Sequence, residues 1–168
     1  VGELPVAVES GVTTVATSAD GATLAAGCGD GQVVLWDAAS LELRRSIPSG
    51  DDRRVSRLSL SADGTTVGAS YASAASRDNA VRIFDATTGD ARHSWPGPYN
   101  GVELSADGAT VALATFDGAL ELRDVDSGAL LRVPPTELGG SLLGDFCEPF
   151  LDFPRVCREE FCDGSRLL

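Results

Sequence analysis

Ser18-Ala19-Asp20-Gly21 occurs three times in this chain, again at residues 61–64 and at residues 105–108. The intervals between the aspartates are 43 and 44 residues. A fixed period of about 20–50 residues is the mark of a protein built from repeated structural units that stack on their neighbours. The tetrapeptide therefore predicts a repeat protein and fixes the length of its unit.

Three further landmarks follow each tetrapeptide in the same order. The first is a second turn, found at Asp30-Gly31, Asp78-Asn79 and Asp117-Gly118. The second is a pair that ends in aspartate, found at Trp36-Asp37, Phe84-Asp85 and Arg123-Asp124. The third is an apolar residue before proline, found at Ile47-Pro48, Trp95-Pro96 and Val133-Pro134. Chance does not produce four landmarks with nearly constant spacing, and only the middle unit carries an insertion, at residues 71–75.

Each unit reads as four short strands. In the first unit, residues 12–16, 23–26, 33–36 and 42–47 are apolar or β-branched segments bounded by turn residues. Asp-Gly turns supply the positive φ of tight hairpins, so consecutive strands should pair antiparallel. Pro48 removes a ladder donor and ends the last strand. The unit is predicted to be a four-stranded antiparallel meander.

Composition excludes some classes of function and leaves others open. The chain has 168 residues and a formal net charge of −12. No apolar run approaches the roughly 20 residues that cross a bilayer, and an acidic surface repels nucleic-acid backbones. We therefore expect neither membrane nor nucleic acid as a partner. We also expect a cytoplasmic location, and because the chain begins at Val1 rather than Met, a preceding targeting signal stays open. The charge favours a partner with a basic surface, or serves only to keep the protein in solution.

The residues that most often carry chemistry are few and poorly placed for it. The cysteines, at positions 28, 147, 157 and 162, do not have zinc-binding or redox spacing. His93 is the only histidine, and no nucleophile or carboxylate is placed with it. The glycine-rich stretch at residues 27–31 leads into a strand, so no helix N-terminus is available there for a phosphate. We expect no catalytic residue, no metal and no cofactor.

The units resemble the repeats of the WD-repeat (WD40-type) β-propeller family. Trp36-Asp37 matches the dipeptide that names the family, and Asp30, Asp78 and Asp117 match its turn aspartate. The resemblance implies that this aspartate joins a hydrogen-bonded chain of histidine, serine and tryptophan within the blade. Ser76 and Thr115 match the serine, whereas Cys28 replaces it in the first unit and Gly50-Asp51 stands where Gly-His would open the second. The repeats are degenerate, and their polar network is expected to be incomplete.

The repeats divide the chain into blades. We predict an all-β fold of three complete four-stranded blades at residues 11–50, 51–98 and 99–135. Residues 1–10, with Leu4-Pro5, read as the end of a preceding blade, and residues 136–168 as a tail rich in phenylalanine and cysteine. The tail is a degenerate blade, a cover for the open edge, non-native coding sequence or an aromatic docking peptide. Because a propeller ring needs about 4–8 blades, we expect a partial chain whose ring is completed by the rest of the propeller or by an oligomeric partner.

The resemblance implies a non-catalytic scaffold that binds other proteins; the alternative is a fragment of a lactonase-like or other small-molecule-binding propeller enzyme. Alternate turns of a meander lie at opposite ends of the blade, and the end with the insertion collects the variable side chains. The residues predicted to contact a partner there are Arg53, Arg54, Tyr71, Arg77, Tyr99, Asn100 and Phe116. The residues assigned to the fold are Asp30, Asp78, Asp117, Trp36, Asp37, Phe84, Asp85 and Asp124.

Overall fold

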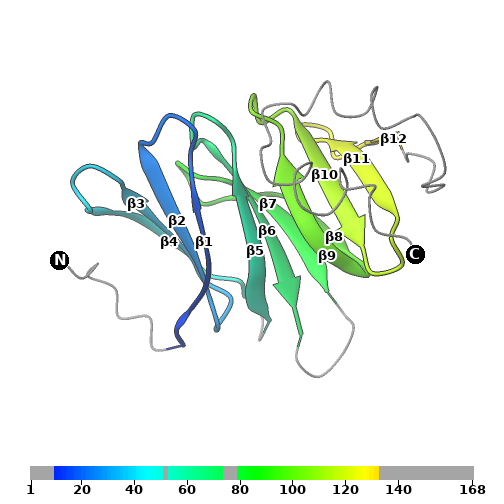
Figure 1. Cartoon of the computed structure of the whole chain (residues 1–168), viewed down its shortest axis with the longest axis horizontal. Coiled ribbons are helices and arrows are strands. Elements are labelled where there is room, and N and C mark those ends of the chain that lie inside the picture. Colours follow the sequence, from blue (N-terminus) through cyan, green and yellow to red (C-terminus); the bar gives the residue numbers. More distant parts are fainter. Residues whose placement is uncertain (1–9, 51–52, 74–78, 133–168) are drawn as a thin grey trace, which may run out of the picture. The chain divides into compact units, whose positions relative to one another are not determined.

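A computed structural model describes residues 10–50, 53–73 and 79–132 of the chain. This part contains three separate four-stranded sheets and no helix (Figure 1). In each sheet the strand order follows the chain, and every pair of neighbouring strands is antiparallel. The predicted four-stranded meanders are confirmed.

Each repeat forms one sheet, here called a blade. Blade 1 consists of β1 (Val12–Thr17), β2 (Thr23–Cys28), β3 (Val33–Asp37) and β4 (Leu43–Ile47). Blade 2 consists of β5 (Arg54–Leu60), β6 (Thr66–Ala72), β7 (Ala80–Asp85) and β8 (Ala91–Pro96). Blade 3 consists of β9 (Tyr99–Leu104), β10 (Thr110–Thr115), β11 (Leu120–Asp124) and β12 (Leu130–Arg132).

The Ser-Ala-Asp-Gly tetrapeptide closes the first hairpin of each blade through its own side chains. In blade 2 the Ser61 hydroxyl donates to Asp63 Oδ1 at 2.7 Å and accepts the backbone N–H of Thr66 at 3.0 Å. Gly64 has a φ of 68°, which residues with a Cβ rarely adopt. The equivalent serines make the same two bonds in blades 1 and 3, so the recurrence in the sequence is a recurrence of one turn.

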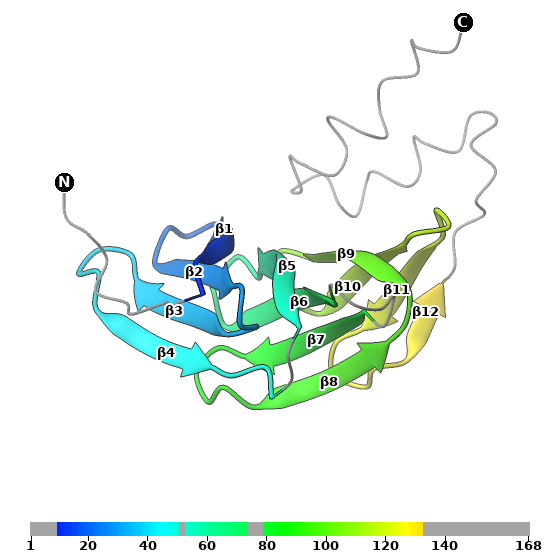
Figure 2. The same ribbon diagram turned by 90° about the horizontal axis from the view of Figure 1, so that it is seen from below.

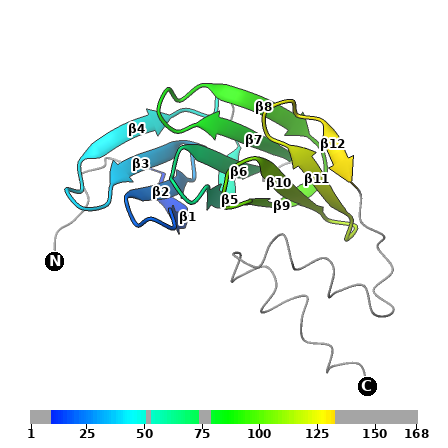
Figure 3. The same ribbon diagram turned by 90° about the horizontal axis from the view of Figure 1, so that it is seen from above.

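The blades pack face to face, and their facing side chains form the core. Val33 and Leu35 of blade 1 share a buried cluster with Val67 and Phe84 of blade 2. A second buried cluster joins Ile83 and other residues of β7 to β9 and β10 of blade 3. Figures 2 and 3 show the three sheets following one another along the chain. In the part of the chain that the structure describes, blade 2 contacts both of its neighbours and the array remains open.

Blade 1 buries the tryptophan of the WD-type pair but leaves its indole N–H without a partner. Trp36 is 1% exposed and lies in an apolar cluster with Ala26, Cys28 and Val34. The predicted burial of Trp36 is confirmed. Its Nε1 has no hydrogen-bond partner among the described residues, and Cys28 stands where the family pattern has the serine. The polar network of blade 1 is therefore incomplete, as predicted.

Candidate functional site

Each blade presents two kinds of connection at its opposite ends. The β1–β2 and β3–β4 hairpins, with their equivalents in blades 2 and 3, form what we call the turn end. The β2–β3 hairpin, its equivalents and the connections between blades form what we call the loop end. Antiparallel pairing along the whole meander requires this alternation.

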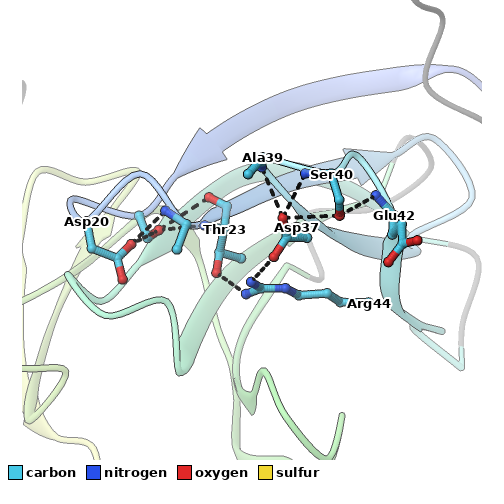
Figure 4. A network of polar contacts seen from close by, with 9 residues as sticks. Asp20, Thr23, Asp37, Ala39, Ser40, Glu42 and Arg44 are labelled. Atoms are coloured by element: carbon cyan, nitrogen blue, oxygen red, sulfur yellow. Dashed lines mark hydrogen bonds and ion pairs between the residues drawn. The ribbon is translucent and has the colours of Figure 1, made fainter.

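The turn end of blade 1 is a closed network of polar side chains (Figure 4). Asp37 Oδ1 accepts the backbone N–H groups of Ala39 and Ser40 at 3.0 and 2.9 Å, and its Oδ2 accepts from Arg44 at 2.5 Å. Arg44 also donates to Thr23 Oγ1 at 2.8 Å. The Ser40 N–H and then the Arg44 guanidinium hold the pKa of Asp37 well below its ordinary value. The network stabilises the turn, and both oxygens of the Asp37 carboxylate are engaged in it.

The same arrangement recurs in the other blades. Asp85 accepts the backbone N–H groups of Thr87 and Thr88 and pairs with Arg92 at 2.6 Å. Asp124 accepts the backbone N–H and the hydroxyl of Ser127. Each of these bonds lowers the pKa of the carboxyl that accepts it. Aspartates bound in this way in every blade serve the turns of the fold.

The turn aspartates at the loop end are less uniform. Asp117 accepts the Thr115 hydroxyl, which lowers its pKa, and Asp30 accepts the backbone N–H of Gln32 at 3.1 Å. Asp78 lies outside the described residues.

Phe84, which takes the place of Trp36 in blade 2, is 3% exposed in the core between blades 1 and 2.

Two tyrosines predicted to be exposed contacts are buried. Tyr71 lies within β6 and is 0% exposed, because it alternates with Val67 and Ala69 along the strand and so faces the core. The Arg82 guanidinium lies 4.7 Å from the centre of its ring. The insertion thus begins inside a strand, and the expectation of a loop residue at position 71 is wrong.

Tyr99 is likewise held within the blade. It is the first residue of β9, is 6% exposed, and donates its hydroxyl hydrogen to Glu121 Oε2 at 3.1 Å. Burial, followed by the charge of Glu121, raises the pKa of Tyr99. The expectation that Tyr99 is an exposed contact is also wrong, because its ring packs in the core between blades 2 and 3.

The remaining predicted contacts lie at the loop end. Phe116 is 60% exposed, and its backbone N–H donates to the Pro98 carbonyl at 2.9 Å. Arg54 is exposed, whereas Arg53 and Asn100 are half-buried. Arg77 lies outside the described residues. The structure brings Phe116 to the connection between blades 2 and 3.

Arg57 lies in the middle of β5 and contacts the loop end, which the sequence did not indicate. Its side chain is exposed, and its Nε donates to the Asn100 carbonyl of blade 3 at 3.1 Å. Strict alternation from Arg54 would place it on the opposite face of β5. A register shift between Val55 and Arg57 changes that face, and the sequence carries no clear signal of such a bulge.

The described residues offer little other chemistry. His93 stacks on Trp95 with ring centres 5.2 Å apart, and its Nε2 lies 3.2 Å from the Asp126 carbonyl oxygen. Arg123 lies over the same Trp95 ring at 5.3 Å, so His93 belongs to the joint between blades 2 and 3. In the described ranges no group of histidine, cysteine and carboxylate side chains is placed to hold a metal ion. No helix there is long and apolar enough to span a membrane.

Comparison with known proteins supports the repeat assignment. The family model "WD domain, G-beta repeat" matches residues 3–37. Similar solved structures include the RRP9 WD40 repeats (TM-score 0.61, 15% identity) and the Myceliophteria thermophila Cps50 (Swd1) β-propeller domain (0.61, 25%). A chain of a mitotic checkpoint complex is also similar (0.60, 23%). No curated protein sequence matches the chain.

These matches cover most of the chain but a smaller share of each solved protein. The RRP9 match covers 73% of this chain and 38% of the solved chain. The corresponding shares are 74% and 37% for Cps50, and 73% and 36% for the chain of the mitotic checkpoint complex. The present chain therefore spans under two-fifths of the length of these propellers. The four-stranded blades, the Trp36-Asp37 pair and the family match agree with one another. The chain is similar to the WD-repeat family over residues 3–37, and its described blades have the fold of WD-repeat β-propellers.

Proposed function

We propose that this chain is a non-catalytic scaffold that binds another protein through the loop end, with Phe116 as a central contact. The observation that carries the proposal is the exposure of Phe116, 60%, on a hairpin turn tied to the blade connection at Pro98. Aromatic side chains are enriched at the energetic centres of protein interfaces. A turn held by strands loses little conformational entropy on binding.

Three further points support this function. WD-type propellers commonly present such rigid loops to other proteins, and one similar chain was solved within a mitotic checkpoint complex. The one histidine in the chain is engaged in a stack between blades. The recurring aspartates are bound in their own turns, which suits a structural role better than a catalytic one.

Affinity purification with the whole chain tests the proposal. The baits are the wild type, Phe116→Ala and Leu43→Ala, and the proteins they retain are quantified by mass spectrometry. Leu43 is the matched control because it is 53% exposed and lies at the turn end of β4. We expect one set of partners to be lost with Phe116→Ala and kept with Leu43→Ala, while all three baits melt alike. Equal retention by all three would place the binding site elsewhere.

A further inference from the structure

Two arginines on the first strand of blade 2 lack a carboxylate partner in the described part of the chain. Arg54 and Arg57 both lie on β5, the first strand of blade 2, and both are exposed. Arg54 makes no ion pair with any described residue, and Arg57 bonds only the neutral carbonyl of Asn100. By contrast, Arg44 and Arg92 at the turn end each pair with an aspartate.

A bulge in β5 puts these two arginines on one face of the sheet. Arg54 pairs with Ala72 and Arg57 pairs with Ser70, and the register shifts between Val55 and Arg57. Ala72 and Ser70 are two residues apart on β6, so they share a face, and the arginines opposite them share it too. Without the extra residue, positions 54 and 57 would point to opposite sides.

A segment of three residues, 98–100, ties the arginines to Phe116. The Arg57 Nε bonds the Asn100 carbonyl, and the Phe116 N–H bonds the Pro98 carbonyl. A cationic side chain and an exposed aromatic ring are therefore anchored on the same short piece of backbone, where blade 2 joins blade 3. Arg54 extends the cationic group along the same face of β5.

Within the described residues, the distribution of charge makes this group distinct. Nine carboxylates of the described part lie in the hairpins of the turn end: Asp20, Asp37, Glu42, Asp63, Asp85, Asp90, Asp107, Asp124 and Asp126. In the described hairpins and blade connections of the loop end the carboxylates are Asp30 and Asp117. Asp51, Asp52 and Asp78 also belong to these connections in the sequence and lie outside the described residues, so the contrast in charge between the two ends is one of the described residues.

We infer that the protein segment bound at the loop end is acidic and carries an apolar side chain. Guanidinium groups bind carboxylates through short charge-assisted hydrogen bonds, often two at a time. Arg54 and Arg57 supply such groups, and Phe116 supplies the apolar contact beside them. This inference rests on the proposed function and specifies the chemistry of its partner. It reverses the expectation, drawn from net charge alone, of a partner with a basic surface.

Selection from a library of random short peptides tests the inference. The whole chain is the target, and the peptide that is most enriched becomes the probe, with its affinity measured by fluorescence anisotropy. We expect enriched sequences to combine Asp or Glu with an apolar residue, and their affinity to fall with added salt because charges drive the contact. Enrichment of basic or uncharged sequences, or no enrichment at all, would overturn the inference.

Variants of the chain separate this inference from the proposed function. The double substitution Arg54→Glu, Arg57→Glu should weaken binding of the acidic probe by about tenfold or more, because it replaces attraction with repulsion. Arg45→Glu on β4 is the matched control, with the same change of charge per residue, and should change affinity by less than about twofold.

The Phe116→Ala variant completes the test. Loss of probe binding with Phe116→Ala but not with the double variant would keep the loop end as the site and overturn the acidic chemistry. Binding that neither substitution changes would overturn both. Each variant is first compared with the wild type by its melting temperature, since all of these side chains are exposed or half-exposed and their replacement should leave the fold intact.

Discussion

At the turn end, aspartates are bound by backbone N–H groups, hydroxyls and arginines of their own blade, and neighbouring blades are joined by backbone hydrogen bonds. At the loop end, Arg54 has no carboxylate partner among the described residues and Phe116 is largely exposed. The same strands connect the two ends, so the contrast does not come from a difference in fold. It separates side chains that stabilise the blades from side chains that remain available to a partner.

The largest expected effect comes from truncating one aromatic side chain at each end. Trp36 is buried where β3 reaches the turn end, so Trp36→Ala should lower the free energy of unfolding by about 3–5 kcal/mol. Phe116→Ala at the loop end should change it by less than about 0.5 kcal/mol, because the ring is mostly exposed. Denaturant unfolding of the whole chain measures both values. Similar decreases in the free energy of unfolding for the two variants would contradict the difference between the two ends.

A pair of glycines gives a smaller and more specific effect. Both have positive φ, 68° at Gly64 and 85° at Gly118, so alanine costs about 1–2 kcal/mol at either position. A Cβ at Gly64 would also lie 2.5 Å from Thr23 Oγ1 of blade 1, whereas at Gly118 nothing lies within 4 Å. Gly64→Ala should therefore cost about 1–3 kcal/mol more than Gly118→Ala. Equal melting temperatures for the two variants would contradict the tight contact at the turn end.

The smallest effect of any single group is expected from the carboxylates in acid. Hydrogen bonds lower the pKa of Asp63 and Asp107 below the ordinary value of 3.8. A carboxyl with a lowered folded pKa stabilises the protein fully above its unfolded pKa and loses this contribution as pH falls through the folded value. The free energy of unfolding should therefore decrease as the pH drops below about 4. Asp63→Asn should reduce that slope, and stability that stayed constant down to strong acid would refute the assignment.

The strands and the described turns were predictable because each depends on local residues. The turn at residues 61–64 is closed by bonds among its own residues and with the nearby Thr66. The tetrapeptide alone is therefore enough to predict this turn. The burial of Trp36 followed from its position in a short apolar strand. The replacement of the serine by Cys28 likewise indicated an incomplete network in blade 1.

Exposure at the loop end was harder to predict because it depends on register and on the neighbouring blade. The insertion in the middle unit predicts a loop at Tyr71, whereas this residue continues the alternation of β6. Tyr99 is buried by packing across the joint with blade 2. The role of Arg57 depends on a bulge in its strand and on a carbonyl more than forty residues away in the chain.

The hydrogen bonds between the Ser-Ala-Asp-Gly turns make each joint from parts that every blade carries. Asp20 N–H donates to the Ala62 carbonyl, and Ala62 N–H donates to the Ala106 carbonyl. Gly64 and Gly108 each lie against the serine and threonine of the blade before. Duplication of the coding segment for one whole blade would therefore copy donor, acceptor and glycine together. Deletion or insertion of part of a blade would separate them, so the joints themselves favour growth and loss of this array in whole units.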